Sequence, residues 1–426
     1  MWERFSYYGM RALLVLYMTD HLTQNAEKKT VILGFSQLEN ALQTVFGPMT
    51  VQPLVSQIYG IYTGFVYFTP FLGGILADRL LGQRKTVIIG AVLMAIGHFL
   101  MVFDQFFLIA LLYLILGNGC FKPNLLTQVG SLYCEGDSRR DGAFTIFYMG
   151  INLGAFFSPL VCGTLGQVYG WHYGFSAAGI GMVIGLFIYL AGQKYLSPDM
   201  ISQKKISNLK NKPLSRKEFK SIFGLGVLCI LNIIFWGVYE QQGNTIQLFA
   251  DKNTDWRIWG WELPSTWFQC FNPAFIFILS PILNIFWSRQ AKKNKEPNSI
   301  AKMALGSILL GLSFLILILG VSHIQSNQKL SFIWLAACTF VYTMGELHLS
   351  PIGLSLVTQV APARFASMLM GVWFLSLFFG NYLSGYLGTY YEKMTKENFF
   401  FLLTGLGIAT GIAIFSLKRP LSKAIG

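Results

Sequence analysis

Long apolar runs alternate with short polar segments along the whole chain, and this pattern predicts membrane-spanning helices. A membrane span needs about 20 mostly apolar residues. Runs of this kind cover residues 2–20, 52–76, 86–103, 106–128, 142–164, 172–192, 221–248, 265–288, 300–322, 330–352, 365–390 and 398–417. We therefore expect an all-α polytopic membrane protein with twelve transmembrane helices.

A polar segment at 193–220 interrupts this pattern near the middle of the chain. Its sequence, QKYLSPDMISQKKISNLKNKPLSRKEFK, is basic and too polar to enter a membrane. Six predicted spans precede it and six follow it. The pattern therefore predicts an N-terminal six-helix bundle at 1–192, a cytoplasmic linker at 193–220 and a C-terminal six-helix bundle at 221–426.

The composition supports a membrane protein and excludes a soluble globule. Hydrophobic residues make up 54% of the chain and charged residues 12%, against about 25% charged residues in soluble domains. The net charge of +13 is then read as loop charge that sets orientation, and no nucleic-acid partner is expected. With both termini in the cytoplasm, the cytoplasmic segments carry 22 Lys and Arg residues and the outer loops carry 7, as the positive-inside rule requires.

The two halves carry a short basic loop at matching positions. GGILADRLLGQRKT joins the second span to the third, and WSRQAKKNKEPNS joins the eighth to the ninth. The first of these loops resembles the loop signature of the major facilitator superfamily, whose two parallel six-helix halves form a common transporter plan. We expect Asp78 and Arg84 in this loop to pin span ends and gate the cytoplasmic side.

The first predicted span carries an unusual polar stripe. At about 100° per residue, Glu3, Arg4, Tyr7, Tyr8 and Arg11 fall on one arc of the helix. Charges near a helix end can instead reach the headgroups by snorkelling. The length of the stripe favours a water-filled cavity, because a charge inside a span costs about 2.5–3.5 kcal/mol on insertion scales.

Four further polar residues lie inside apolar runs, and each has a plainer alternative. Lys122 could snorkel from the end of its span, and Asn152 could join two helices by a hydrogen bond. Glu240 and Glu346 are short carboxylates for which snorkelling is harder, and Trp236 lies one turn before Glu240. Together these residues predict a polar, cavity-lining site.

Other chemistry is not indicated by the sequence. The six cysteines show no metal-ligand or disulfide spacing, and His98, His172, His323 and His348 are expected to be structural. The glycine-rich runs lack a Walker lysine and indicate close helix packing. We expect no cofactor and no metal site, so active transport would depend on an ion gradient.

Five motifs resemble those of the proton-dependent oligopeptide transporter family of the major facilitator superfamily, bacterial type. In chain order they are ERFSYYG, GNGCFKPN, FYMGINLGAFFSPLVCGTLG, FWGVYEQQGNTIQLFAD and MGELHLSPIGLSLV. Together they cover nearly the whole chain. The resemblance implies a major facilitator fold and proton-coupled import of di- and tripeptides across the bacterial inner membrane, by a protein expected to be a monomer in the lipid bilayer.

The resemblance also implies roles for individual residues. Proton coupling falls to Glu3, Arg4, Arg11 and Glu240. Substrate binding falls to Arg4, Tyr7, Tyr8, Tyr67, Lys122, Asn152, Trp236, Glu240, Asn272, Glu346 and Trp373. The proton is the coupling ion in this reading, and no other cofactor is implied.

Two departures and three alternatives accompany the resemblance. The first glutamate of the family motif would fall before Met1, so either the start of the chain is incomplete or misassigned, or this carboxylate is missing. The linker has no room for the two additional helices of many bacterial relatives. The alternatives are a family member for another small zwitterionic or anionic substrate, such as an amino acid or organic anion, a peptide-binding sensor, and a membrane enzyme, which the absence of a nucleophile or metal motif disfavours.

Overall fold

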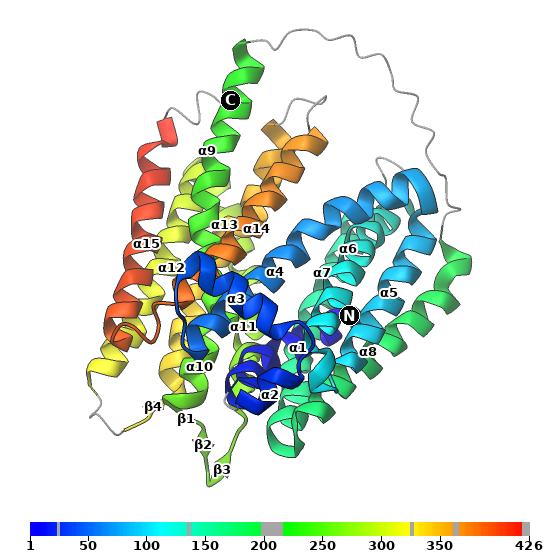
Figure 1. The fold of residues 1–426 in the computed structure, drawn as a ribbon. Coiled ribbons are helices and arrows are strands. Elements are labelled where there is room, and N and C mark those ends of the chain that lie inside the picture. The colour runs from blue at the N-terminus through cyan, green and yellow to red at the C-terminus, as the bar shows by residue number, and fades with distance from the viewer. Residues whose placement is uncertain are drawn as a thin grey trace. The chain divides into compact units, whose positions relative to one another are not determined.

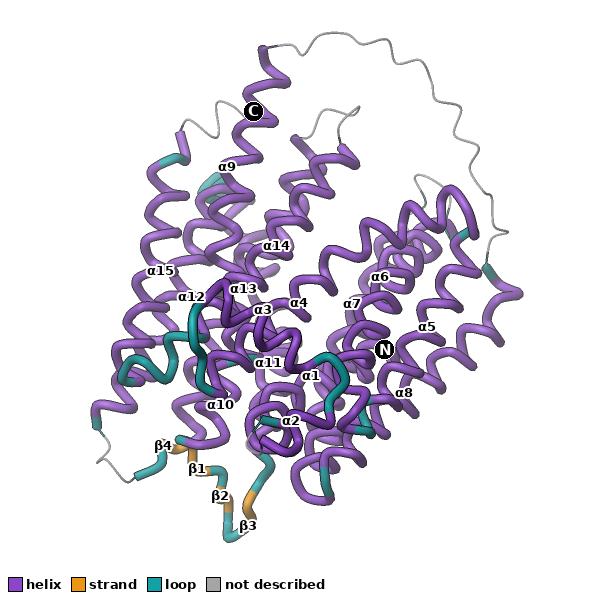
Figure 2. The backbone as a smooth tube through the Cα atoms, in the orientation of Figure 1, coloured by secondary structure: helices purple, strands orange, loops and turns teal. Residues whose placement is uncertain are grey.

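The computed structural model describes residues 1–23, 26–133, 137, 139–196, 216–323, 328–360 and 366–419. Nearly all of the described backbone is helical (Figures 1 and 2). Most of the predicted linker 193–220 lies outside the described residues.

The helices before the linker include two that no apolar run predicted. They are α1 (Trp2–Tyr17), α2 (Ala26–Val31), α3 (Phe35–Phe46), α4 (Val51–Leu76), α5 (Gln83–Leu100), α6 (Phe107–Ser131), α7 (Arg139–Ser158) and α8 (Trp171–Gly192). The unpredicted helices are α2 and α3, which lie between the first and second predicted spans. The turns between these helices are the π-helical η1 (Met18–Leu22), η2 (Ala77–Leu81), η4 (Pro159–Gly163) and η5 (Leu165–Tyr169) and the 3-10 helical η3 (Asp104–Phe106) and η6 (Gln193–Tyr195).

The helices after the linker are followed or interrupted by short turns and strands. They are α9 (Arg216–Tyr239), α10 (Thr245–Lys252), α11 (Phe271–Lys292), α12 (Ser299–Ser322), α13 (Phe332–Val360), α14 (Ala366–Gly388) and α15 (Lys396–Ser416), with the 3-10 turns η7 (Glu240–Gly243) and η8 (Ser265–Cys270). The strands are β1 (Thr254–Asp255), β2 (Arg257–Ile258), β3 (Trp261–Glu262) and β4 (Leu330–Ser331). Strand β1 pairs in parallel with β4, placing Thr254 opposite Leu330, and β2 pairs with β3.

The chain divides into two compact units. Unit 1 holds α1–α8 together with the segment Glu262–Cys270, and unit 2 holds α9, α10 and the chain from Phe271 onward. The segment Glu262–Cys270 therefore belongs to unit 1, although its neighbours in sequence belong to unit 2.

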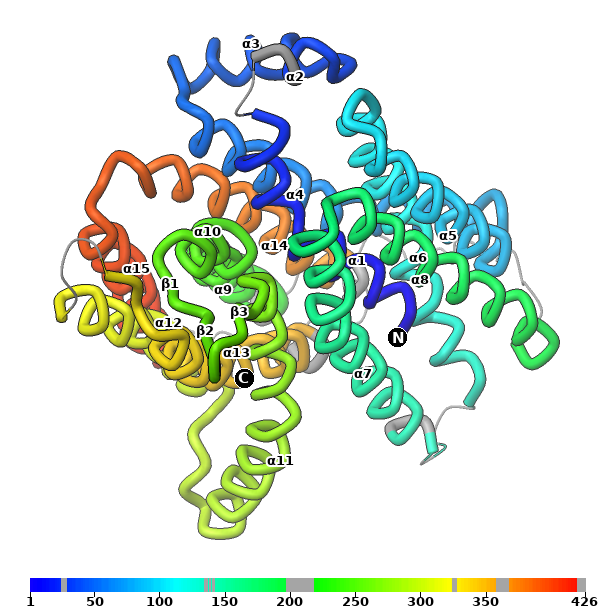
Figure 3. The backbone as a smooth tube through the Cα atoms, turned by 90° about the horizontal axis from the view of Figure 1, so that it is seen from below, coloured from blue at the N-terminus to red at the C-terminus, as the bar shows by residue number. Residues whose placement is uncertain are grey.

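Unit 1 is built by close approach of helices at glycines. Helix α6 packs against α4 and α5, and α8 packs against α1 and α5; α5, α6 and α8 stay side by side in both Figure 1 and Figure 3. At the crossing of α4 and α6, a Cβ atom on Gly73 would lie 2.0 Å from the carbonyl oxygen of Gly119. Small residues of this kind let helix backbones touch where lipid gives no hydrophobic driving force.

The helices of unit 2 also approach closely at glycines. Helix α12 packs against α13 and α15, and α9 packs against α14. A Cβ atom on Gly345 of α13 would lie 2.7 Å from the carbonyl oxygen of Gly306 on α12. In the glycine-rich run 405–412, a Cβ atom on Gly411 of α15 would lie 2.8 Å from the carbonyl oxygen of Ala304 on α12, so this run also provides a close helix contact.

The chain is a multi-pass membrane protein. A long helix lies in each of the twelve predicted ranges, and ten helical segments of the described chain are long and apolar enough to cross a membrane. Helices α1 and α5 are not among the ten: α1 has only 16 residues and carries three charged side chains, and α5, with 18 residues, begins with the polar residues Gln83, Arg84 and Lys85. The number of spans therefore stays a prediction.

Two predicted spans are each covered by one helical segment, Glu218–Lys252 and Ser265–Lys292, but neither segment is a regular α-helix throughout. In the run 221–248 the α-helix α9 ends at Tyr239 and the 3-10 turn η7 follows it. The run 265–288 begins with the turn η8, and α11 starts only at Phe271. Both interruptions place polar backbone groups inside apolar sequence, where partners elsewhere in the fold must satisfy them.

Candidate functional site

The first turn of α1 carries a buried ion pair. The Nε atom of Arg4 lies 2.9 Å from Oε2 of Glu3, and the two side chains are only 11% and 8% exposed. The Arg4 guanidinium also lies 5.8 Å from the ring centroid of Tyr7, which is buried. The predicted polar stripe is thus buried within the protein at this end of α1.

Tyr67 and Lys122 extend this group onto two further helices. Arg4 lies within electrostatic range of Tyr8 on α1 and of Tyr67 on α4. The ammonium of Lys122 on α6 lies 4.3 Å from the ring centroid of Tyr67, within the range of a cation–π contact. Three helices of unit 1 therefore bring two cations, a carboxylate and three phenols together.

Arg11 lies on α1 one turn after Tyr7 and Tyr8 and contacts a second set of tyrosines. Its Nε atom donates a 2.7 Å hydrogen bond to the hydroxyl of Tyr59 on α4. Tyr59 and Tyr62 are both buried, and Tyr62 lies within electrostatic range of Tyr7. Sequence reasoning missed Tyr59 and Tyr62, although their recurrence at near-helical spacing in QIYGIYTGFVYF could have indicated them.

Asn152 lies on α7 and is buried. Its side-chain amide donates to the carbonyl of Tyr148 on the same helix, at 3.0 Å. Two residues along, a Cβ atom on Gly154 would lie 2.5 Å from the carbonyl oxygen of Met1. Asn152 therefore lies beside the contact between α7 and the start of α1.

The two predicted gate residues lie in different settings. Asp78 is exposed in the π-helical turn η2. Arg84, at the start of α5, donates a hydrogen bond to the backbone carbonyl of Leu196 after η6. Arg84 thus joins the start of α5 to the backbone that follows η6 in unit 1.

In unit 2, Glu240 marks the point where α9 ends. It is 1% exposed and begins the turn η7, one turn after the buried Trp236. The turn is held from α14, because Gln241 Nε2 donates to the carbonyl of Ser384 at 2.9 Å. Asn244 Nδ2 donates to the same carbonyl at 3.4 Å.

Glu346 lies in a polar cluster with residues from two other helices. Asn272 Nδ2 of α11 donates to Oε2 of Glu346 at 2.8 Å and lies 3.1 Å from Oγ1 of Thr343. The Tyr239 hydroxyl of α9 also bonds to Glu346, and Glu240 lies within electrostatic range of it. The predicted residues Glu240, Asn272 and Glu346 are therefore brought together.

Two tyrosines complete this cluster, and sequence reasoning missed both. The rings of Tyr239 and Tyr342 stack with centroids 4.7 Å apart. The Tyr342 hydroxyl donates to the carbonyl of Tyr239, where the end of α9 leaves backbone acceptors without helical partners. A tyrosine in an apolar run is ordinary, so no sequence signal marked these two.

Trp373 on α14 is buried against another helix. It is 3% exposed, and a Cβ atom on Gly353 of α13 would lie 2.4 Å from its ring. Only a glycine at position 353 leaves room for this indole, so α13 and α14 fix its position.

Comparison with known proteins decides the family. A model of the POT family matches residues 84–212 and 197–402. The peptide transporter YePEPT of Yersinia enterocolitica is 32% identical over 91% of this chain and 85% of its own length. The di-/tripeptide transporter of Lactococcus lactis subsp. cremoris is 30% identical over 100% of this chain and 94% of its own.

The chain belongs to the POT family. A crystal structure of a mutant of the peptide transporter POT, in complex with alafosfalin, superposes with a TM-score of 0.84 at 30% identity, over 100% of this chain and 93% of that one. This POT-family protein is therefore a transporter, not an enzyme, with the all-α polytopic fold of the major facilitator superfamily. The resemblance found in the five motifs is confirmed.

Proposed function

We propose that this protein is a proton-coupled symporter that imports di- and tripeptides by alternating access. The observation that carries the proposal is its similarity, over nearly its whole length, to proteins named as peptide and di-/tripeptide transporters. We place it in the bacterial inner membrane with both termini in the cytoplasm, in line with the distribution of 22 and 7 basic residues. The bundles 1–192 and 221–426 would be its two rocking halves, and it would act as a monomer without a cofactor.

Peptide recognition would use opposite charges for the two ends of the substrate. Arg4 and Lys122 of unit 1 supply cations for the peptide carboxylate, since a guanidinium and an ammonium both suit this acceptor. Glu240 and Glu346 of unit 2 supply carboxylates for the peptide amine. A single amino acid has a shorter amine-to-carboxylate distance than a peptide, so recognition of both charged ends would favour peptides over free amino acids.

Uncharged side chains would line the rest of the binding site. Aromatic rings contact varied side chains without demanding a fixed hydrogen-bond partner, which fits a substrate class that varies in its side chains. We assign this role to Tyr7, Tyr8, Tyr67, Trp236 and Trp373, and we assign contact with the peptide backbone to Asn152 and Asn272.

Proton coupling would depend on a carboxylate whose partner changes during the cycle. A carboxylate beside an arginine favours its charged form, and a buried carboxylate without a cation favours its neutral form. Glu3 is paired with Arg4 at 2.9 Å, and Arg11 lies about two turns further along the same helix. Glu240 is buried. We therefore assign proton coupling to Glu3, Arg4, Arg11 and Glu240, while Asp78 and Arg84 would serve the cytoplasmic gate.

Uptake by reconstituted protein tests this function. Proteoliposomes should accumulate labelled dialanine when the outer buffer is more acidic than the lumen, and unlabelled tripeptide should compete. Glu240→Gln should abolish the response to the pH gradient, and Lys122→Ala should lower uptake at least about tenfold, since it removes a charged hydrogen bond of about 1.5–3 kcal/mol.

The controls separate the alternatives. Free alanine should not compete; competition by alanine and not by tripeptide would indicate an amino-acid transporter. Binding of dialanine without accumulation would favour a peptide sensor. If uptake ignores the gradient and both variants transport as well as wild type, the proposed function is wrong.

A further inference from the structure

A cluster of metal-ligating side chains lies in unit 1, away from the residues assigned above. It joins His21 in η1, Asp104 at the start of η3 and His172 in the first turn of α8. One potential ligand atom from each residue lies within 4.8 Å of the other two. Each of these residues is about 70 to 80 positions from the next along the sequence, so no motif spacing revealed the cluster.

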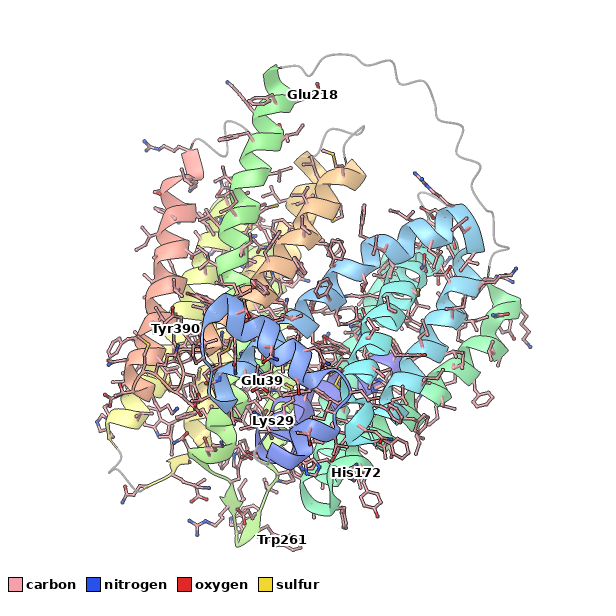
Figure 4. The ribbon with its side chains drawn as sticks, in the orientation of Figure 1. Lys29, Glu39, His172, Glu218, Trp261 and Tyr390 are labelled. Carbon is pink, nitrogen blue, oxygen red and sulfur yellow. The ribbon has the colours of Figure 1, made fainter. Side chains whose placement is uncertain are left out.

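The pair His21 and Asp104 already has coordination-like spacing. His21 Nε2 lies 3.0 Å from Oδ2 of Asp104. Two ligand atoms that share a tetrahedral Zn²⁺ at 2.0–2.2 Å are about 3.3–3.6 Å apart, so a small outward shift would admit the ion. The side chains of His21 and Asp104 are 22% and 26% exposed. His172, which is labelled in Figure 4, is exposed. An ion can therefore reach the cluster from solvent.

The surrounding fold holds the first two ligands in place. Tyr17 is buried, stacks on His21 with ring centroids 5.3 Å apart, and donates a 2.6 Å hydrogen bond to Oδ1 of Asp104. This bond leaves Oδ2 directed at His21. A donor behind a carboxylate ligand is the usual outer-shell arrangement of metal sites.

The backbone around the cluster is equally constrained. η1 is a π-helical turn, a rare geometry that often marks functional positions, and it is closed by Thr23, whose N–H and hydroxyl both donate to the carbonyl of Met18. The turn η3 is tied to the segment before α3, because the N–H of Leu33 donates to the carbonyl of Gln105 at 3.0 Å. The ring of His172 meets that of His21 edge-on, with centroids 6.1 Å apart.

We propose that His21, Asp104 and His172 form a Zn²⁺ site. Two imidazole nitrogens and one carboxylate oxygen suit a borderline divalent cation, and water would fill the open position. All three ligands belong to unit 1, so the ion braces the end of α1 against α8 and η3 inside one unit. Its expected effect is therefore on the stability of that unit, and not on movement between states of the transporter.

Direct binding of Zn²⁺ tests the proposal. The full chain, purified in detergent with its affinity tag removed, is titrated with ZnCl₂ against a chromophoric chelator at pH 7.5. One ion per chain should bind to wild type. His172→Ala should weaken binding at least about tenfold, since even outer-shell changes cost 10- to 100-fold. His323→Ala is the matched control, because His323 is also exposed, and it should bind as wild type does.

Three further measurements exclude misfolding and adventitious binding as explanations. Tyr17→Phe keeps the ring but removes the donor to Asp104, and should weaken Zn²⁺ binding about tenfold. Zn²⁺ should raise the thermal midpoint of wild type and His323→Ala but not of His172→Ala. X-ray absorption should show two imidazoles in wild type and one in His172→Ala.

The contrary results are equally specific. The absence of saturable binding by wild type below about 0.1 mM Zn²⁺ would overturn the proposal. Equal loss of affinity in His172→Ala and His323→Ala would do the same, because it would show binding at scattered surface histidines. In either case His21 and Asp104 would be only a hydrogen-bonded clamp on Tyr17.

Discussion

Lys122 and Lys393 both hold an ammonium over a tyrosine ring, but their surroundings differ. Lys122 lies 4.3 Å from the Tyr67 centroid, inside a span and beside the group of Arg4. Lys393 lies 5.8 Å from the Tyr390 centroid and is exposed. The same kind of contact therefore occurs both in a proposed binding site and at the surface.

This difference predicts unequal effects of the same substitution. Lys122→Gln should weaken binding of dialanine about 10- to 100-fold, because a charged hydrogen bond contributes about 1.5–3 kcal/mol. Lys393→Gln should leave the Kd unchanged. Calorimetric titration in detergent measures both values, and equal affinities for the two variants would remove Lys122 from the peptide site.

At the residue scale, the sequence predicted the charged residues of the candidate site but not their aromatic partners. Glu240 and Glu346 stand out because an ionisable residue in an apolar run is costly. Tyr239 and Tyr342 join the same cluster, yet a tyrosine in such a run costs little and gives no signal. The proximity of His21 to His172 depends on chain folding, so the local sequence around each histidine indicates no metal site.

At the element scale, helix crossings depend on individual glycines. Gly73 and Gly74 are neighbours on α4, but only Gly73 faces α6, where an added Cβ would lie 2.0 Å from the carbonyl oxygen of Gly119. At Gly74 an added Cβ meets nothing within 4 Å. The two positions share a helix and a local sequence and differ in what they face.

Replacing each glycine by alanine should therefore have opposite effects. Gly73→Ala should destabilise the protein by about 1–3 kcal/mol through overpacking, and it should lower the thermal midpoint in detergent. Gly74→Ala should be neutral or stabilising by up to about 1 kcal/mol, because alanine favours a helix more than glycine does. A Gly73→Ala protein as stable as Gly74→Ala would contradict the packing at this crossing.

The ends of helices were the least predictable elements. The run 221–248 is apolar enough to suggest one helix, but Gln241 and Asn244 find acceptors on Ser384, about 140 residues away. Those bonds satisfy the side chains at the break and help to hold the turn η7. A partner so distant in sequence has no signature in the local pattern, whereas the core of each predicted span was recognisable from its hydrophobicity alone.

At the scale of the whole molecule, one segment does not follow the division at the linker. Gln167 of η5 accepts hydrogen bonds from the N–H and the hydroxyl of Thr266, at 3.0 and 2.9 Å, and donates to Ser265 at 2.9 Å. Trp267 Nε1 donates to Thr164 at 2.9 Å. These bonds explain why Glu262–Cys270 belongs to unit 1, although α11, which follows it, belongs to unit 2.

We predict that this segment releases from unit 1 during each cycle of the proposed alternating access. Gln167→Cys with Ser265→Cys, joined by a short bis-methanethiosulfonate, should therefore stop dipeptide uptake, and a reductant should restore it.

Leu33→Cys with Gln105→Cys is the matched control, because it links two segments of unit 1 that are already hydrogen-bonded and should leave uptake intact. The single-cysteine variants control for the native thiols, of which Cys120, Cys162, Cys229, Cys270 and Cys338 are free and buried. Uptake that continues with the first pair fully cross-linked would mean that Glu262–Cys270 moves with unit 1 throughout, so that the hinge between the halves lies in the residues flanking this segment.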